Sequence, residues 1–262
     1  PSPAVAGYLD GNVRDRGGHP SSGGFTVRDP ASAALARALT DRGMAHADVA
    51  DSAGAGRPLD DVTVVIPVRD DAEGVAALVG ALAPEVERGL RVVVVDDGSA
   101  RPPDVPGAQV LHHEASRGPS AARNAGTAHA VAAGARVVVY LDADVLPLPG
   151  WLDPLLAHLD DPAVAAVAPR IVAAEPGRCW VRGHETARSA LDMGPRPARV
   201  RPRTRVAYVP SAALAVRPAA LPAAPAGGDG PFDERMHVAE DVDLCWRADE
   251  AGARIRYEPA SR

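Results

Sequence analysis

Short apolar runs alternate with helically spaced apolar residues from residue 62 onward. A continuous run of β-branched residues predicts a strand buried on both faces, and apolar residues three or four apart predict a helix packed on a sheet. The predicted strands are Val62–Val68, Arg91–Val95, Val110–His113, Val137–Leu141 and Val164–Val172. The predicted helices are Glu73–Leu82, Ser120–Ala133 and Trp151–Leu159. This order predicts an α/β fold with a doubly wound, mainly parallel sheet flanked by helices.

The first 58 residues follow a different pattern. Residues 8–24 are rich in Gly, Asp, Arg and Ser, and only residues 31–42 have helical spacing, with Leu35 and Leu39 four apart and Gly43 as a candidate C-cap. Residues 51–58 are rich in Gly and Ala, which is typical of a linker. We therefore expect a partly helical N-terminal extension and linker over residues 1–58 and one α/β domain over residues 59–262.

Two aspartates, Asp142 and Asp144, directly follow the predicted strand Val137–Leu141. Side chains alternate along a strand, so residues two apart point the same way and both carboxylates can face one spot at the strand end. A proton or a cation relieves their repulsion, and Mg2+ or Mn2+ is the usual partner of such oxygen ligands. An ordinary acidic turn has the same composition, so the pair alone leaves both interpretations open.

Acidic motifs stand at two other element boundaries. The motif Asp96–Ser99 (DDGS) follows a predicted strand, where a carboxylate can accept hydrogen bonds from a nucleobase or a ribose. A surface Asp-Gly turn is the alternative. The motif Glu240–Asp243 (EDVD) precedes an amphipathic stretch, and its Asp241 could act as a general base. Acidic residues also stabilise a helix N-terminus by their interaction with the helix dipole, which would explain this motif without a catalytic role.

A glycine loop, Ser116–Gly118, leads into the predicted helix that carries Arg123. A helix N-terminus and an arginine both favour a phosphate or another anion. A solvated arginine on a surface helix is the alternative.

Composition narrows the class of protein. With 262 residues and 46% hydrophobic residues, the chain can form one large α/β domain with a substantial core. The net charge of -6 argues against a general nucleic-acid binder. Cys179 and Cys245 match no metal spacing or disulfide framework, which favours a reducing cytoplasm, and no stretch reaches the ~20 apolar residues of a membrane span. All 28 Lys and Arg residues are arginine, as in GC-rich bacterial genomes.

Five motifs in this order resemble a family 2 glycosyltransferase of the GT-A fold, and they span about residues 62–259. They are Val64–Arg69, Val94–Ser99, Arg117–Gly126, Leu141–Asp144 and Glu240–Asp243. The resemblance implies a metal-dependent, inverting transferase that uses a sugar nucleotide. It places Pro67, Arg69, Asp96, Asp97 and Arg123 at the nucleotide, Asp142 and Asp144 at Mn2+ or Mg2+, and Asp241 at the acceptor hydroxyl as the catalytic base.

A narrower resemblance rests on four further stretches and on the helical segment before residue 50. The stretches are Tyr208–Leu214, Phe232–Glu234, Glu240–Arg247 and Arg256–Pro259. They are similar to the glycosyltransferase family of the mycofactocin system, which implies transfer of β-linked glucose from UDP-glucose to a peptide-derived redox cofactor of actinobacteria. Relatives normally continue into a strand and a histidine that can join the metal site, so we expect the domain to be truncated after Arg262.

The acceptor side is less defined. Glu240 and Trp180 are candidates there, while Trp151 and Trp246 are expected to pack as helix core residues. An arginine-rich segment lies between Glu175 and Arg205. It could contact the donor diphosphate, an anionic acceptor or the inner face of a membrane, although a solvated, mobile basic loop is the favoured interpretation.

Two alternative functions stay open. One is a transferase of the same fold that acts on a cell-wall polysaccharide or a lipid-phosphate acceptor. The other is a non-catalytic module that binds a sugar nucleotide.

Overall fold

The computed structural model describes residues 26–49, 56–173, 191–225 and 230–262. The chain divides into two units, Pro1–Ala47 and Asp48–Arg262. In the first unit, helix α2 spans Pro30–Asp41, which confirms the helix predicted over residues 31–42. Its N-cap Asp29 accepts a hydrogen bond from the backbone N–H of Ser32 at 2.7 Å, and Ser32 bonds back to the backbone of Asp29. This capping box begins the helix.

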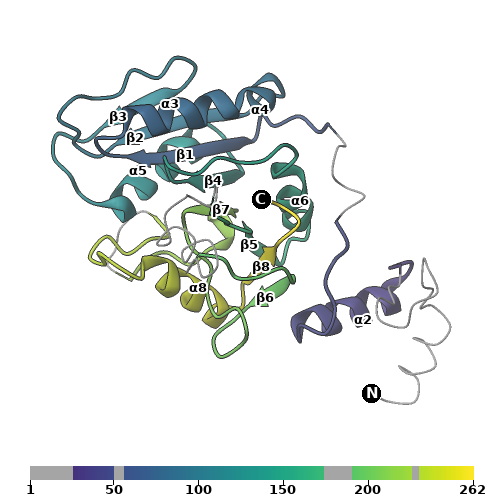
Figure 1. Cartoon of the computed structure of the whole chain (residues 1–262). Coiled ribbons are helices and arrows are strands. Elements are labelled where there is room, and N and C mark those ends of the chain that lie inside the picture. Colours follow the sequence, from purple (N-terminus) through teal and green to yellow (C-terminus); the bar gives the residue numbers. More distant parts are fainter. Residues whose placement is uncertain (1–25, 50–55, 174–190, 226–229) are drawn as a thin grey trace, which may run out of the picture. The chain divides into compact units, whose positions relative to one another are not determined.

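The second unit is organised by a sheet with the strand order β3-β2-β1-β4-β7-β5-β8-β6 (Figure 1). The strands β3, β2, β1 and β4 run parallel to one another, whereas β7 is antiparallel to both β4 and β5. At the far edge β8 is parallel to β5, and β6 is antiparallel to β8. The strand bounds are β1 Val62–Val68, β2 Arg91–Asp96, β3 Gln109–His112, β4 Val137–Leu141, β5 Val164–Pro169, β6 Ala198–Val200, β7 Ala213–Val216 and β8 Arg254–Glu258.

Helices cover both faces of this sheet because its central strands are apolar on both faces. One core contains Val64 and Ile66 of β1 together with apolar residues of α3 and α6. The other contains Val65 of β1 together with apolar residues of α5 and α8. The helices are α3 Ala72–Ala81, α4 Ala83–Glu87, α5 Pro119–Ala132, α6 Leu152–Leu159, the 3-10 turn η2 Pro218–Ala220 and α8 Glu240–Glu250.

Most of the predicted elements are confirmed, and the differences lie at their ends. The strand predicted over Val164–Val172 is too long, because β5 ends at Pro169 and the backbone N–H of Arg170 bonds to the carbonyl of Ser261 instead of a strand. The pattern did not predict the short elements α4, η2, β6, β7 and β8, and it indicated α8 only as an amphipathic stretch after the motif Glu240–Asp243. Among the helices in the described parts of the chain, none is long and apolar enough to cross a membrane.

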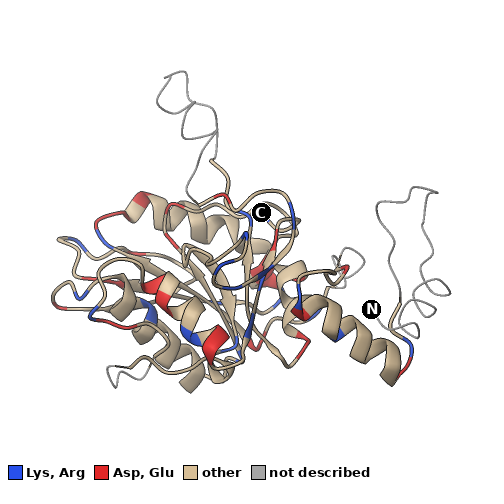
Figure 2. Cartoon of the chain, turned by 90° about the horizontal axis from the view of Figure 1, so that it is seen from below, with Lys and Arg blue, Asp and Glu red and all other residues tan. Residues whose placement is uncertain are grey.

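Acidic and basic residues are interspersed along the ribbon in Figure 2. The net charge of -6 is therefore not concentrated in one segment, and the electrostatics of a site depend on its local ion pairs.

Candidate active site

Arg123 brings two of the predicted motifs together. It lies in the first turns of α5 and is only 3% exposed. Its Nη2 donates to Oδ1 of Asp142, after β4, at 2.6 Å, and its Nη1 donates to Oε1 of Glu240, the first residue of α8, at 3.2 Å. Its guanidinium also lies 5.6 Å from the ring centre of Phe232. The alternative of a solvated surface arginine is therefore wrong for Arg123.

Residues Asp142–Asp144 form a turn directly after the carboxyl end of β4. The backbone N–H of Asp142 bonds to the carbonyl of Ala212 at 2.9 Å, and the N–H of Val145 bonds to the carbonyl of Asp142 at 3.0 Å. The Asp142 side chain is 33% exposed, and Asp144 is exposed.

This pair fits a hard divalent cation, because both side chains present carboxylate oxygens, which Mg2+ and Mn2+ prefer, and both are at least partly exposed. Asp142 already balances the charge of one cation, the guanidinium of Arg123. Within the described ranges, no group of three or more His, Cys, Asp or Glu side chains could hold a metal. A cation at these two carboxylates would therefore need further ligands, and substrate phosphates commonly supply them.

The predicted base, Asp241, is half-buried in the first turn of α8. Burial raises the pKa of its carboxyl, the charge of Glu240 adds to the rise, and a hydrogen bond from the backbone N–H of Val242 opposes it. Helix α8 begins after Ala239, which has a left-handed backbone (φ 62°). A carboxyl with a raised pKa next to a buried ion-pair cluster can accept a proton more readily than an exposed aspartate.

Asp97 anchors the glycine loop that leads into α5. Its carboxylate accepts hydrogen bonds from the backbone N–H groups of Arg117 and Gly118, both at 2.9 Å, and from the Ser116 hydroxyl at 2.7 Å. His113 Nδ1 lies 2.8 Å from the same carboxylate. Burial alone would raise the pKa of Asp97, but these hydrogen bonds lower it to about 2. The carboxylate is thus ionised and holds the loop in place.

Its neighbour Asp96 is fully buried at the end of β2. Its carboxylate lies 2.7 Å from Nδ1 of His112 and accepts a bond from the backbone N–H of Ser99 at 3.1 Å. Between these residues the chain turns at Gly98 (φ 76°), where a Cβ would stand 2.6 Å from the backbone nitrogen of Ser116. Both aspartates are therefore engaged by protein groups, and contact of either one with a nucleoside stays a prediction.

Pro67 and Arg69 lie at the carboxyl end of β1, next to the same loop. Pro67 is half-buried and pairs in register with Val95 of β2. Arg69 is exposed, and its Nη1 donates to the hydroxyl of Ser116 at 3.2 Å. Arg69 and Asp97, which directly follow β1 and β2, thus both bond to the hydroxyl of Ser116.

The acceptor-side predictions have mixed outcomes. Trp180 lies outside the described residues, and Glu240 is present at the site as the partner of Arg123. Trp151 is buried, as expected, but the expectation for Trp246 is wrong. This side chain is 46% exposed, and its Nε1 donates to the carbonyl of Ala207 at the protein surface.

The favoured interpretation of the arginine-rich segment as a solvated basic loop holds in part where the structure describes it. Four of its arginines are exposed, namely Arg196, Arg201, Arg203 and Arg205, but Ala198–Val200 forms strand β6 and several guanidinium groups are paired. Arg199 and Arg201 both pair with Asp249 of α8, at 3.2 and 3.4 Å. The guanidinium of Arg205 donates to the carbonyls of Met193, Arg196 and Pro197. Arg178, Arg182 and Arg188 lie outside the described residues.

The sequence reasoning gave no role to Asn124, which fixes the segment before α8. Its side chain exchanges hydrogen bonds with the backbone of Phe232, at 2.8 and 3.1 Å, and donates to Glu234 at 3.1 Å. A Cβ on Gly230 would collide with the Asn124 side chain. The signal available in the sequence was its place in the motif Arg117–Gly126, directly after Arg123.

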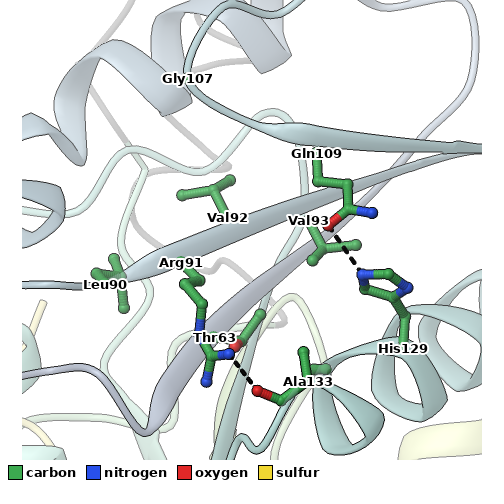
Figure 3. Close-up of a pocket in the computed structure, with 10 residues that line it drawn as sticks. Thr63, Leu90, Arg91, Val92, Val93, Gly107, Gln109, His129 and Ala133 are labelled. Carbon is green, nitrogen blue, oxygen red and sulfur yellow. Dashed lines mark hydrogen bonds between the residues drawn. The ribbon is translucent and has the colours of Figure 1, made fainter.

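A cavity of about 220 Å³ lies at the opposite end of the sheet (Figure 3). It is lined by Thr63 and Arg91, at the beginnings of β1 and β2, and by Gln109 and His129, which bond to each other at 2.9 Å. Because ligands of doubly wound sheets bind beyond the carboxyl ends of the strands, this cavity is separate from the candidate active site.

Comparison with known proteins agrees with the fold and with the order of the motifs. Residues 63–220 match the model of glycosyl transferase family 2, and the chain therefore belongs to this family. A pre-mycofactocin glycosyltransferase of Mycobacterium tuberculosis, found in two strains, is 50% identical over 244 residues, which cover 90% of this chain and 48% of that protein. The chain thus spans about half the length of the curated relatives it matches.

Solved glycosyltransferases share the GT-A fold with this chain. A mannosyltransferase from Pyrobaculum calidifontis, solved with GDP-Man and Mn2+, is 22% identical with a TM-score of 0.54, over 78% of this chain and 55% of its own. TarS 1–349 of S. aureus, solved with UDP-GlcNAc, is 21% identical with a TM-score of 0.55, over 76% of this chain and 56% of its own. At these identities the likeness concerns the fold alone.

Proposed function

We propose that the protein is an inverting glycosyltransferase that moves a sugar from a nucleotide donor to a hydroxyl group. The observation that carries this proposal is the bridge from Asp142 through Arg123 to Glu240, next to Asp241. The bridge links Asp142, one of the two carboxylates proposed at the donor, to Glu240, the residue before the proposed base. Residues 59–262 form the transferase domain in this proposal, and residues 1–58 form an extension and linker.

On the donor side, the residues that hold the nucleotide surround the loop Ser116–Gly118. Asp97 fixes the loop through backbone N–H groups, and Arg69 reaches Ser116 from β1. The N-terminus of α5 follows, and its free N–H groups and dipole favour a diphosphate. Asp142 and Asp144 would hold Mg2+ or Mn2+, which when bound neutralises negative charge on the departing diphosphate.

On the acceptor side, Asp241 removes the proton from the attacking hydroxyl. Its raised pKa strengthens it as a base, and it directly follows Glu240, whose charge contributes to that rise. The hydroxyl oxygen forms a bond to the anomeric carbon as the bond from that carbon to the diphosphate oxygen breaks. One displacement inverts the anomeric centre, so an α-linked donor gives a β-linked product without a covalent enzyme intermediate.

The substrates are proposed from the relative. The pre-mycofactocin glycosyltransferase is 50% identical over most of this chain, which supports a peptide-derived redox cofactor of the mycofactocin type as the acceptor. We propose glucose from UDP-glucose as the donor sugar. The solved neighbours carry GDP-Man and UDP-GlcNAc, so the fold does not restrict the nucleotide or the sugar.

A donor-hydrolysis screen tests this function. Slow hydrolysis of UDP-glucose, GDP-mannose, UDP-galactose and UDP-GlcNAc is measured with Mg2+, with Mn2+ and with EDTA, and the screen is repeated on a longer chain that covers the relative's full length. The proposal predicts metal-dependent hydrolysis with a preference for UDP-glucose. Binding of a sugar nucleotide with no turnover for any donor or acceptor would instead support the non-catalytic module.

A further inference from the structure

We propose that Arg123 is a positioning residue that neutralises Asp142 while no donor is bound and makes cation binding depend on the nucleotide. The inference rests on the proposed function, because it takes Asp142 as part of the donor site. It goes beyond that function, because it assigns to Arg123, which contacts both Asp142 and Glu240, the balancing of the Asp142 charge until a cation takes its place.

Arg123 is built into the protein as an internal cation. Its side chain is almost fully buried, and its two terminal nitrogens bond to carboxylates from two different elements, at 2.6 Å for Asp142 and 3.2 Å for Glu240. In the described part of the chain, its Nε has no hydrogen-bond partner, so these two carboxylates receive its strongest bonds. A buried charge without such partners would be strongly destabilising, which explains why the three side chains stay together.

The same guanidinium opposes a metal ion at Asp142. Two cations that share one carboxylate repel each other, and the repulsion is large where little water screens it. A nucleoside diphosphate brings negative charge to this place and reduces the repulsion. The cation alone is therefore expected to bind weakly, and cation and nucleotide are expected to strengthen each other's binding by the same factor.

Cation binding at Asp142 is also expected to affect the acceptor side of the site. When a cation takes over the charge of Asp142, the guanidinium of Arg123 remains bonded to Glu240 at the start of α8. Glu240 directly precedes Asp241, so occupation of the donor site changes the charge balance beside the base. Arg123 thus links the two halves of the site without contacting the acceptor hydroxyl.

A purely structural role predicts the opposite effect on the metal. If Arg123 only held Asp142 in place, its removal would misplace this carboxylate and weaken cation binding. If Arg123 competes with the cation, its removal strengthens cation binding in the absence of nucleotide. The affinity for Mn2+ alone therefore separates the two roles.

The experiment measures Mn2+ binding by electron paramagnetic resonance, with and without UDP, for the wild type, Arg123→Gln and Arg88→Gln. Arg88 pairs with Asp153 of α6, also at 2.6 Å, and is the matched control for the loss of a short ion pair elsewhere in the domain. Arg123→Gln should bind Mn2+ without UDP roughly 10-fold more tightly than the wild type, and UDP should then add less. Arg88→Gln should match the wild type. Equal or weaker Mn2+ binding by folded Arg123→Gln would overturn the inference.

A second comparison covers the case in which Arg123→Gln does not fold. The double variant Arg123→Gln/Glu240→Gln removes one buried cation and one carboxylate together, so the net charge of the cluster is kept. It should bind Mn2+ alone more tightly than Glu240→Gln, and equal affinities would again overturn the inference. If the wild type binds Mn2+ no better with UDP than without UDP, the proposed donor site itself is wrong. A comparison of the variants with one another would not reveal this failure.

Discussion

The Nη2 atom of Arg123 donates to Oδ1 of Asp142 across 2.6 Å, from a helix to the end of a strand. The other end of the same guanidinium bonds to Glu240 at the N-terminus of α8. Motifs that are about 120 residues apart in the chain, at Arg123 and at Glu240, thereby form one charged cluster beyond the carboxyl end of β4. The proposed function depends on this cluster.

The carboxylates after β4 should be required for metal-dependent nucleotide binding. Asp144→Ala removes one oxygen ligand of the proposed cation, so calorimetric binding of UDP should lose its dependence on Mn2+. Turnover should fall by about 100-fold or more, because charge on the leaving diphosphate is no longer neutralised. Asp104→Asn, at an exposed aspartate, is the control. Normal Mn2+-dependent UDP binding by Asp144→Ala would show that the metal assignment is wrong.

Asp241 should be needed for transfer but not for donor binding. Asp241→Asn keeps the shape of the side chain and removes its ability to accept a proton, so turnover should fall by about 100-fold to 10,000-fold. The dissociation constant for UDP should stay within a factor of about three of the wild type, since Asp241 is assigned to the acceptor side. Turnover and the dissociation constant for UDP are measured on the same preparation, and unchanged turnover would refute the base assignment.

The pH dependence should follow the raised pKa of Asp241. Because the base acts in its ionised form, kcat/KM should fall as the pH decreases through this pKa, at a higher pH than for an ordinary aspartate. The sign for stability is reversed: the folded protein binds this proton more tightly than the unfolded chain, so this group's contribution to stability decreases as pH rises. Asp241→Asn should therefore raise the Tm at neutral pH. A lower Tm would contradict the proposed burial.

Asp97 should stabilise the fold in the opposite pH direction. Its pKa is lowered to about 2 in the folded protein, against about 3.9 for a free aspartate, so its bonds contribute about 2 kcal/mol above pH 4. This contribution is lost as the pH falls from about 4 toward 2. Asp97→Asn should lower the free energy of unfolding by about 2 kcal/mol at neutral pH, as measured by urea denaturation. An effect as small as that of Asp104→Asn would contradict the loop-anchoring role.

The close packing of α5 on the sheet can be tested with two glycines. A Cβ on Gly126 would collide with Val65 of β1 and stand 3.1 Å from a Val95 methyl of β2, so Gly126→Ala should cost about 1 to 3 kcal/mol of stability. Gly80, an exposed residue of α3, has open space around it, and Gly80→Ala should add up to about 1 kcal/mol. Similar urea midpoints for the two variants would contradict this packing.

The sequence pattern was sufficient for the parallel half of the sheet. Its strands are continuous apolar runs such as Val137–Leu141, which can be recognised without knowledge of their neighbours. The antiparallel strand β7 and the short edge strand β6 were not predicted. Each has only three or four residues, and its pairing with β4, β5 or β8 is fixed by tertiary contacts.

The candidate site was predicted as a set of residues but not as a set of contacts. The motif order placed Asp142 and Glu240 in one family pattern, and strand alternation placed Asp142 at a strand end. No local pattern indicates that one arginine bonds to both carboxylates, because the partners are 19 and 117 residues away in the chain. The internal bonding of Asp96 and Asp97 was hidden for the same reason, since His112 and His113 come from the neighbouring strand and loop.

The most direct test of the account is transfer by a protein of the relative's full length. UDP-glucose with a 13C-labelled sugar, Mn2+ and the mycofactocin-type acceptor are incubated with the wild type and with Asp241→Asn, and the acceptor is analysed by mass spectrometry. The account predicts a labelled hexose on the acceptor for the wild type with Mn2+, and none with EDTA or with Asp241→Asn. Undiminished labelling by Asp241→Asn, or equal labelling in EDTA, would contradict it.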